Sequence, residues 1–469
     1  MQNTPTIFVI FGATGDLAEK KLFPALFDLY RKNLLPKKFR IVALGRKEFN
    51  DNSFRKMVDD VLADHSDTNA ISSFLKIVAY FRGVFDKEDT YASLSKHLSG
   101  LDKELGACSN KLFYLSTPPS LYELILKHLS RSGLTIPCGG DKGWTRIIVE
   151  KPFGRDSKTA ARLDSLLGSL FEEEQIFRID HYLAKETLQN ILTFRFSNTI
   201  FEPLWSGKHI DLVEINLFET TTMGRRGPFY DGIGALRDVG QNHLLAMLAL
   251  VAMEKPESLA ANAIREAREN VLAKLSPVSA RDLGKRVFRA QYEDYRGEAG
   301  VKADSDTETF FSLKAFVKNR RFKGVPFILT SGKAFREAKA EIKIHFKDPD
   351  PTFFLPEQLP EQEHNTLTFS IQPNEGIAIN FWAKVPGFEK KIEQKNLSFK
   401  YTDLPSEKIL PDAYERVIFD CILGDQTLFA STKEIEAEWK FITPILKLWN
   451  ALPLHTYKAG SDGPKVLFN

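Results

Sequence analysis

The sequence predicts an α/β domain with a parallel sheet, followed by an α+β domain with a large, mostly antiparallel sheet. In residues 1–179, short apolar runs alternate with stretches of helical periodicity, which is typical of parallel strands joined by helices. From about Asp180 many runs alternate polar and apolar residues, as in Glu341–Phe346, which indicates a sheet with one covered face. The 469 residues suffice for two cores. We therefore expect domains at 1–179 and 180–469.

The composition is that of an ordinary globular protein, with 43% hydrophobic and 27% charged residues. A net charge of +3 is too small to indicate binding to nucleic acid or to a membrane surface. The longest apolar run, Leu244 to Met253, is too short to span a bilayer. Cys108, Cys138 and Cys421 are predicted to be free thiols in a reducing compartment. Because the chain starts almost directly with a strand, no signal peptide is expected, and the predicted location is the cytoplasm.

The first predicted strand, Thr6–Phe11, is followed by the glycine-containing segment Gly12-Ala13-Thr14-Gly15-Asp16-Leu17-Ala18 and then by a predicted helix, Lys20 to Lys32. Gly12 allows a tight turn, and Gly15 lets a pyrophosphate approach the backbone at the start of the helix. A plain turn between strand and helix is the alternative. The strand before it and the helix after it favour a dinucleotide site in a Rossmann-type domain.

A second predicted strand, Arg40–Gly45, ends at the cations Arg46 and Lys47. NAD enzymes commonly place an acid near this point to accept the ribose hydroxyl, whereas a cation suits the 2′-phosphate of NADP. NADP is therefore favoured, and NAD stays open as a second coenzyme because Glu48 follows closely. Residues 50 to 108 are predicted to be mostly helical.

Two further strands are predicted at Lys111–Ser116 and Arg146–Val149. The first leads into Thr117-Pro118-Pro119, which requires an extended turn. The second ends in Glu150-Lys151-Pro152-Phe153-Gly154, where the proline fixes the backbone next to Lys151.

The run from Arg178 to Glu186 combines an acid, an imidazole, a phenol and an ammonium at a predicted junction between a strand (Gln175–Ile179) and a helix (Leu183 to Leu192). His181 and Lys185 are four residues apart, so on a helix they would lie on one face and could bind one anion together. Asp180 would be free to orient a distant group. The alternative is a capping Asp with a solvated charged face.

In the second domain, two predicted helices, Arg237 to Met253 and Pro411 to Leu423, accompany the strands, and Tyr292–Thr307 is predicted to be an exposed loop. Asp238 and His243 stand at the start of the first of these helices. No metal site is predicted, because the other histidines show no ligand spacing. The predicted strands are Asp211–Glu219, Phe310–Val317, Val325–Ser331, Ala340–Phe346, Leu367–Gln372 and Gly376–Val385.

The run Arg178–Glu186 closely resembles the signature R-I-D-H-Y-L-G-K-E of the glucose-6-phosphate dehydrogenase family, with Ala184 in place of the usual glycine. The segments Gly12–Ala18, Glu150–Gly154 and Arg237–Leu245 resemble further motifs of that family, in matching order. The resemblance implies oxidation of glucose 6-phosphate at C1 to the 6-phosphogluconolactone, with reduction of NADP⁺. It also implies a homodimer or a dimer of dimers.

The resemblance assigns roles to individual residues. His243 is the expected general base, since a neutral imidazole titrates near working pH, and Asp180 is expected to hold its tautomer. The family often has a second cation five residues beyond Lys333, where this chain has Ala338, so a role for Arg336 or Lys339 is left open. The expected substrate ligands are His181, Tyr182 and Lys185 for the phosphate, and Lys151, Glu219, Asp238 and Lys333 for the sugar. The expected coenzyme contacts are Gly12, Ala13, Thr14, Gly15, Asp16, Leu17, Arg46, Tyr122 and Lys151, with Tyr122 as a packing aromatic being the alternative for that residue.

Two other functions are compatible with parts of the pattern. A Rossmann-fold oxidoreductase for an unphosphorylated sugar would keep Glu150-Lys151-Pro152 without needing His181 and Lys185. A non-catalytic NADP sensor would have no need of His243. The presence of every set in one chain disfavours both.

Overall fold

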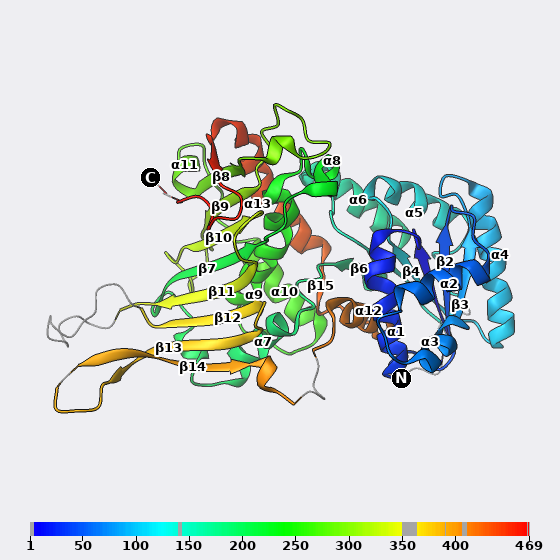
Figure 1. Ribbon diagram of the computed structural model, residues 1–469, viewed down its shortest axis with the longest axis horizontal. Coiled ribbons are helices and arrows are strands. Elements are labelled where there is room, and N and C mark those ends of the chain that lie inside the picture. The colour runs from blue at the N-terminus through cyan, green and yellow to red at the C-terminus, as the bar shows by residue number, and fades with distance from the viewer. Residues whose placement is uncertain are drawn as a thin grey trace.

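The computed structural model describes residues 4–138, 143–348, 364–389, 391–405, 410–466 and 468. Two sheets dominate the molecule, one parallel and one mostly antiparallel, and they lie at opposite ends of its long axis (Figure 1). The two predicted architectures are therefore confirmed.

The first sheet has seven strands in the order β15-β6-β5-β4-β1-β2-β3. Strands β1 to β6 follow the order 3-2-1-4-5-6 of dinucleotide-binding domains, with every neighbouring pair among them parallel. The strand β15, from the second half of the chain, pairs antiparallel with β6 and closes the edge. The strands are β1 (Thr6–Phe11), β2 (Phe39–Gly45), β3 (Val78–Arg82), β4 (Asn110–Leu115), β5 (Thr145–Val149), β6 (Ile176–Ile179) and β15 (Phe429–Ala430).

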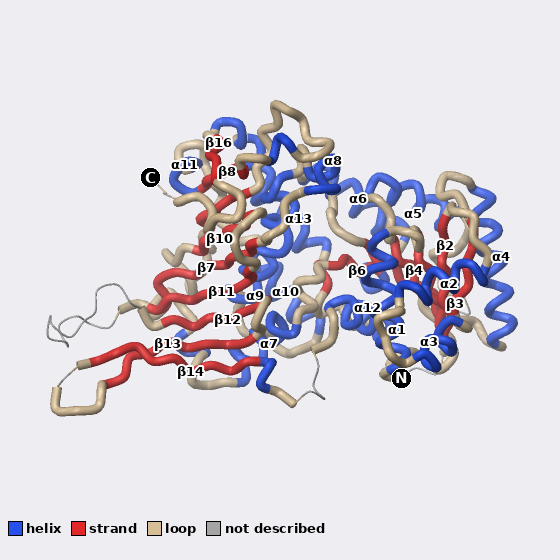
Figure 2. Tube along the Cα trace, in the orientation of Figure 1, coloured by secondary structure: helices blue, strands red, loops and turns tan. Residues whose placement is uncertain are grey.

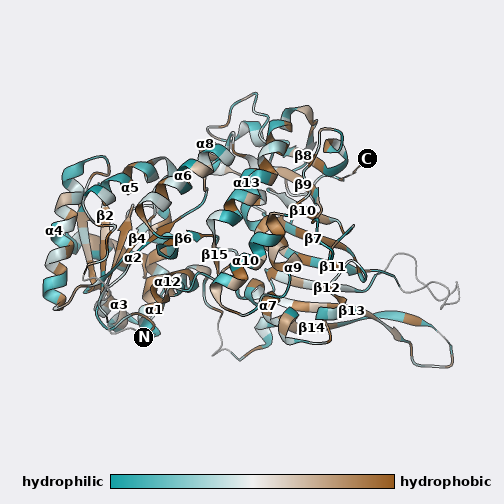
Figure 3. Ribbon diagram, turned by 180° about the vertical axis from the view of Figure 1, so that it is seen from behind, coloured by the Kyte–Doolittle hydropathy of each residue, from teal (hydrophilic) through white to brown (hydrophobic). Residues whose placement is uncertain are grey.

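Helices surround this sheet because its central strands are apolar on both faces: every residue of β1 and β4 is buried. Figure 3 shows these strands in brown and much of the outer helix α4 in teal. The prediction that residues 50 to 108 are mostly helical holds except for β3. The helices are α1 (Phe23–Arg31), α2 (Asp51–Val61), α3 (Thr68–Leu75), α4 (Glu88–Leu105), α5 (Tyr122–Arg131) and α6 (Ser157–Leu170), with a π-helix Ala18–Leu22 ahead of α1.

The second sheet has nine strands in the order β14-β13-β12-β11-β7-β10-β9-β8-β16, seen as neighbouring red strands in Figure 2. It is antiparallel except where β7 meets β10 and β8 meets β16. Strands β8, β14 and β16 were not predicted from the sequence. The strands are β7 (Ile210–Phe218), β8 (Val287–Tyr292), β9 (Phe310–Ala315), β10 (Phe327–Gly332), β11 (Lys339–Phe346), β12 (Thr366–Gln372), β13 (Gly376–Lys384), β14 (Ile392–Lys400) and β16 (Leu454–Tyr457).

One face of the second sheet is covered by helices, as the alternating burial of β7 and β12 requires. Helix α7 packs on β12, and the π-helix Leu236–Leu244, which continues into α9, packs on β7 and β10. These helices lie on the side that faces the first domain (Figure 1). The remaining helices are α7 (Glu186–Ser197), α8 (Gly227–Tyr230), α9 (Leu245–Ala252), α10 (Ala261–Leu272), α11 (Leu283–Arg286), α12 (Ala413–Leu423) and α13 (Thr432–Lys447).

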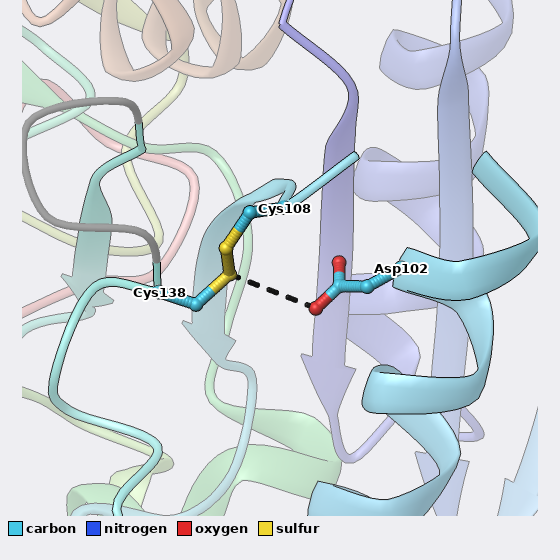
Figure 4. A group of neighbouring side chains, drawn as sticks. All are labelled: Asp102, Cys108 and Cys138. Carbon is cyan, nitrogen blue, oxygen red and sulfur yellow. Dashed lines mark hydrogen bonds between the residues drawn. A yellow bond between two sulfur atoms is a disulfide. The ribbon is translucent and has the colours of Figure 1, made fainter. Parts of the chain in front are cut away.

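The prediction that all three cysteines are free is wrong for two of them, because Cys108 and Cys138 form a disulfide (Figure 4). These residues lie ahead of β4 and β5, which are adjacent parallel strands, so the fold brings the two segments to the same edge. Their Cα atoms are 5.9 Å apart, within the range of a disulfide. Cys421 is free and buried. The reducing compartment inferred from the cysteines therefore loses that support.

Asp102 lies beside this disulfide and could, with the two sulfurs, be considered as a metal-binding group. The ammonium of Lys111 already occupies that place, 2.9 Å from Asp102 Oδ2 and 3.5 Å from Cys138 Sγ.

None of the helices among the described residues has the length and apolar character needed to cross a bilayer.

Candidate active site

The predicted site residues converge between the two sheets. Lys151 follows β5 and Asp180 follows β6, so both lie at the carboxyl edge of the parallel sheet, where such domains bind ligands. The π-helix Leu236–Leu244 carries Asp238 and His243 to the same place from the second domain. A π-helix is rare and occurs mostly at functional sites.

Asp180 and His243 are 63 residues apart in sequence but form a buried pair. Asp180 Oδ1 lies 2.5 Å from His243 Nδ1 and also accepts a hydrogen bond from the backbone N–H of Tyr182 at 3.0 Å. The residues are 4% and 2% exposed. Burial alone would raise the pKa of Asp180, but the charge of His243 and the hydrogen bond to it lower this pKa to about 2. Asp180 is therefore a carboxylate that fixes the orientation of the imidazole.

Lys151 contacts the other nitrogen of the same imidazole. Its Nζ is 2.6 Å from His243 Nε2 and 2.9 Å from the carbonyl oxygen of Asp238, to which it donates. Burial lowers the pKa of His243 below 6.5, and the nearby ammonium of Lys151 acts in the same direction against the opposing effect of Asp180. Because the imidazole is neutral with Nδ1–H facing Asp180, Nε2 carries the lone pair that a general base needs, and this lone pair faces the Lys151 ammonium.

The residues between β6 and α7 form consecutive turns rather than the predicted start of a helix. Leu183 N–H donates to Asp180 O, Lys185 N–H donates to Tyr182 O, and α7 begins only at Glu186. The predicted helix is confirmed, but it starts three residues later than Leu183, because the Asp180 side chain holds the backbone in a turn. His181 and Lys185 owe their placement to these turns and not to a helical face.

His181 and Lys185 nevertheless stand near one another at one end of the site. The ring of His181 lies 4.9 Å from that of His243 and 6.1 Å from that of Tyr414, on which it stacks. Burial lowers the pKa of His181 well below its usual value, and nearby cations, including Lys185, contribute to this. Lys185 donates to the side-chain oxygen of Gln372 and lies 5.3 Å from the ring centre of Tyr182.

A second charged cluster lies on the sheet side of His243. Lys333, after β10, is buried and bonded to Glu219, after β7, and its Nζ lies 3.7 Å from Asp238. The parallel pairing of β7 with β10 brings Glu219 and Lys333 to the same end of the sheet. Burial would raise the pKa of Asp238, but Lys151 and Lys333 lower it, so Asp238 is ionised. These groups can bind several hydroxyls of a sugar.

The segment Gly12–Leu17 forms a turn in which position 12 has no room for a side chain. Gly12 has a φ of +84°, and a Cβ there would clash with the carbonyl oxygen of Ser116. Arg46, at the end of β2, is exposed and has no ion pair in the described part of the chain, whereas Glu48 is paired with Arg82 at 2.6 Å. The acid that could accept ribose hydroxyls is therefore engaged, and the cation suited to a phosphate is free. The residues present fit a dinucleotide with an additional phosphate.

Three predicted residues lie apart from this cluster. Tyr122 is buried, and its hydroxyl donates to the carbonyl oxygen of Glu150 at 3.1 Å, so it supports the turn that carries Lys151. Arg336 is paired with Asp462 at 3.2 Å, and Lys339 is paired with Glu341 at 2.6 Å. Within the described part of the chain, neither of these cations forms an ion pair with Glu219 or Asp238.

The sequence analysis missed groups that support the site from a distance along the chain. Tyr414, on α12, covers His181, and Gln372, at the end of β12, contacts Lys185. Glu308 is buried and accepts from the backbone N–H of Leu236 at 3.0 Å and from Trp449 Nε1 at 2.9 Å, which holds the start of the π-helix. No local motif marks any of them, because each acts through tertiary contact alone.

Comparison with known proteins gives one family for the whole chain. The family description "Glucose-6-phosphate dehydrogenase, NAD binding domain" matches residues 9–190, and "Glucose-6-phosphate dehydrogenase, C-terminal domain" matches residues 192–468. A glucose-6-phosphate 1-dehydrogenase of Aggregatibacter actinomycetemcomitans is 42% identical, over 97% of this chain and 93% of the relative. One of Chlamydia pneumoniae is 39% identical, over 98% and 93%.

Solved structures give the same result. A glucose-6-phosphate dehydrogenase in complex with its substrate glucose-6-phosphate superimposes with a TM-score of 0.90 at 33% identity, covering 99% of this chain and 96% of that chain. The enzyme from Mycobacterium avium superimposes with a TM-score of 0.85 at 30% identity, with the same coverage.

Proposed function

The chain belongs to the glucose-6-phosphate dehydrogenase family, and on this premise we propose that it oxidises glucose 6-phosphate at C1 to 6-phosphoglucono-1,5-lactone with reduction of NADP⁺. The observation that carries the proposal is the buried Asp180–His243 pair, whose Nε2 lone pair faces the cations and acids of a sugar-binding cluster. The C1–H bond becomes a good hydride donor only when the hydroxyl on C1 loses its proton, and in this proposal the pair removes that proton.

We assign the proton transfer to His243 Nε2. Lys151 Nζ lies 2.6 Å from His243 Nε2, so a C1 hydroxyl that loses its proton to Nε2 would have to displace this ammonium from the imidazole. Lys151 would then bind a sugar oxygen while keeping its bond to Asp238 O. As His243 gains the proton, Asp180 stabilises the imidazolium at a distance of 2.5 Å and keeps its tautomer fixed.

The binding of the sugar phosphate is assigned to the other end of the site. Lys185 and His181 lie there on either side of Tyr182, with Lys185 Nζ 5.3 Å from the Tyr182 ring centre and the rings of His181 and Tyr182 5.0 Å apart. Burial lowers the pKa of Lys185, since removal from water disfavours the ammonium, and a bound phosphate would raise that pKa again by favouring the ammonium. Binding energy gained at the phosphate orients C1 against His243, which can contribute several kcal/mol to catalysis.

NADP⁺ is the proposed coenzyme, and when bound it supplies the hydride acceptor. Gly12 and Gly15 would let the backbone approach the pyrophosphate, and Arg46 would bind the 2′-phosphate. The pairing of Glu48 with Arg82 supports NADP over NAD, because it leaves Arg46 uncompensated. NAD remains a proposed second coenzyme, since the Gly12–Leu17 turn does not exclude it.

A homodimer formed through the second sheet is also proposed. The strand β14 ends that sheet and exposes apolar side chains, with Leu397 62% and Phe399 42% exposed. Both belong to a strand whose other residues are also largely exposed. An apolar edge of this kind is a suitable interface for a second copy of the chain. Sedimentation of wild type against Leu397→Lys tests this, with a shift of the variant towards monomer expected.

The activity is tested by mixing the protein with NADP⁺ and glucose 6-phosphate and following the absorbance of NADPH, with glucose as the control substrate. Rapid turnover only with glucose 6-phosphate supports the proposal. Equal turnover of glucose would favour an oxidoreductase for unphosphorylated sugars. Tight NADP⁺ binding with no turnover would favour a coenzyme sensor.

A further inference from the structure

Helix α13 contacts both segments that carry the proposed proton-transfer groups. It packs on α6, which follows the Lys151 segment of the first domain, and on the π-helix that carries His243. Figure 3 shows it between the first domain and the second sheet. None of the roles assigned above falls on this helix.

Trp439, on α13, holds the segment that carries Lys151. Trp439 is buried, and its Nε1 donates to the carbonyl oxygen of Phe153, two residues after Lys151, at 2.8 Å. One turn further along the helix, Thr443 Oγ1 accepts from the backbone N–H of Ser157 at 3.0 Å. The hydroxyl of Ser157 donates to the carbonyl oxygen of Trp439 at 3.1 Å. The backbone after Lys151 is therefore fixed to α13 at two points.

Glu438, also on α13, holds the π-helix. Its Oε2 accepts from Gln241 Nε2 at 2.8 Å, and Gln241 lies two residues before His243. Both side chains are buried, so water does not readily replace this bond. Burial raises the pKa of Glu438 well above its usual value, and the charges of Glu434 and Asp180 act in the same direction. A neutral Glu438 can anchor the π-helix without adding a negative charge near Asp180.

The start of α13 is anchored by contacts of its own. Ser431 and Glu434 form a capping box, in which each side chain accepts from the backbone N–H of the other residue. Arg268 Nε, on α10, lies 2.6 Å from Glu434 Oε1, and this ion pair is buried. The helix can therefore serve as a fixed support for the two segments that it contacts.

This support gains importance once a substrate has bound. In the structure Lys151 and His243 contact one another at 2.6 Å, which joins the two segments directly. In the proposed reaction the C1 hydroxyl displaces Lys151 from Nε2, which weakens this direct link at the moment when alignment matters. The bonds to α13 involve neither the Lys151 nor the His243 side chain, so they stay in place.

We propose that Glu438 and Trp439 are positioning residues, which hold the π-helix and the Lys151 segment at the spacing that brings the C1 hydroxyl to His243 Nε2. Both act through the segments that they bind and not through contact with the sugar. Their effect on turnover rests on the proposed function, whereas their effect on the contact between Lys151 and His243 does not. Because the two bonds act in series, loss of either one should disturb the spacing as much as loss of both.

The first test uses two tryptophan variants. Trp439→Phe removes the N–H group and keeps an aromatic ring. Trp205→Phe is the matched control, because Trp205 is equally buried and its Nε1 donates to the carbonyl oxygen of Val251 at 2.7 Å, about two helical turns beyond His243. Both variants should lose similar stability in thermal unfolding.

The two tryptophan variants should differ in catalysis. The rate of the first turnover, followed as NADPH formation after rapid mixing, should fall about tenfold in Trp439→Phe, because a small misplacement of reacting groups is costly. It should stay near the wild-type rate in Trp205→Phe. KM for glucose 6-phosphate should change little in both, because Lys185 contacts Gln372 and not α13.

Variants of Glu438 test the other bond. Glu438→Gln keeps an acceptor for Gln241 and should react at nearly the wild-type rate, whereas Glu438→Leu should be about tenfold slower. Glu438→Leu combined with Trp439→Phe should be barely slower than either single variant. Thr443→Val, which removes the half-buried bond to Ser157, replaces Trp439→Phe in these comparisons if that variant does not fold.

A measurement without substrate separates this inference from the proposed function. Burial lowers the pKa of His243, and the ammonium of Lys151 lowers it as well. If Trp439→Phe lets Lys151 move away from Nε2, the pKa of His243 should rise relative to wild type and to Trp205→Phe. NMR titration of protein with labelled histidine measures this pKa. The titratable groups that face the imidazole are Lys151, Asp180, His181 and Asp238.

The outcomes are distinct. Equal first-turnover rates and equal His243 pKa values in Trp439→Phe and Trp205→Phe would overturn the proposal, as would clean multiplication of the two losses in the double variant. Equal losses in Glu438→Gln and Glu438→Leu would overturn the role given to the bond with Gln241. A wild type that does not oxidise glucose 6-phosphate would refute the proposed function, and the NMR comparison would still decide whether α13 positions Lys151.

Discussion

Replacement of Asp180 by Asn is the most informative single change, because it removes one charge from a buried pair and leaves its shape almost unchanged. The pKa of Asp180 falls from an ordinary 3.8 to about 2 in the folded protein. At about 1.4 kcal/mol for a tenfold change, the net interaction of the carboxylate with its surroundings is worth about 2 kcal/mol. This value measures what the carboxylate contributes when His243 carries a proton, which is the state reached after proton abstraction.

If the asparagine oxygen faces Nδ1, the tautomer is kept and only this stabilisation is lost, so kcat should fall about 30-fold. If the amide nitrogen faces Nδ1, the imidazole changes tautomer, Nε2 carries the proton, and the loss should approach the roughly 10²–10⁴-fold expected for a lost general base. His243→Asn should lose that full factor directly. The KM for glucose 6-phosphate should change little in either variant, because Lys185 and Lys333 are untouched.

The pH profile supplies an independent check. The Asp180 carboxylate raises the pKa of His243 against the effect of burial, so its removal must lower that pKa further. The acid limb of kcat/KM, where the base becomes protonated, should therefore move to lower pH in Asp180→Asn. Steady-state rates followed by NADPH absorbance at several pH values give kcat, KM and the pH dependence of kcat/KM.

The double variant decides whether the pair acts as a unit. Asp180→Asn combined with His243→Asn should be barely slower than His243→Asn alone, because the aspartate acts only through the imidazole. Clean multiplication of the two losses, or near-normal turnover in His243→Asn, would refute the reasoning.

Three further predictions concern the coenzyme, the phosphate and the stability. Arg46→Ala should weaken the binding of NADP⁺ by about 1.5–3 kcal/mol and the binding of NAD⁺ far less. Equal losses of affinity for the two coenzymes, measured by fluorescence titration, would contradict the assignment. Lys185→Ala should raise KM for glucose 6-phosphate steeply and barely change the poor use of glucose, whereas a parallel loss with both sugars would mark it as structural. Asp420 is buried with Oδ1 unpaired, and burial raises its pKa to about 6, so the folded state binds the extra proton and stability falls as pH rises from about 4 to 6. In urea unfolding, the free energy of unfolding of Asp420→Asn should therefore rise relative to that of wild type between about pH 4 and pH 6, and the difference should stay constant at higher pH. The same difference at every pH would contradict this.

Local patterns were sufficient to predict most strands of the first domain. Residues of β1 and β4 are apolar throughout because helices cover both faces, and such runs are visible in the sequence. Strand β14 was missed because six of its nine residues are exposed, so its sequence lacks the regular apolar positions of a strand with one buried face. The helix predicted from Leu183 begins only at Glu186, because a hydrogen bond to the Asp180 side chain competes with helix formation and periodicity does not reveal such a bond.

The candidate site separates residues that a motif can reveal from residues that only the fold can reveal. Asp180, His181 and Lys185 share one run, so their types and spacing predict a site without any structure. The orientation of that site depends on Lys151 at His243 Nε2 and on Glu308 below the π-helix, and these contacts join segments 92 and 72 residues apart. The Lys151 contact adds a step to the proposed mechanism, in which the substrate would displace this ammonium before His243 could act as the base. The sequence could suggest His243 as the base, but only the packing of the two domains reveals the Lys151 contact that a substrate would have to displace.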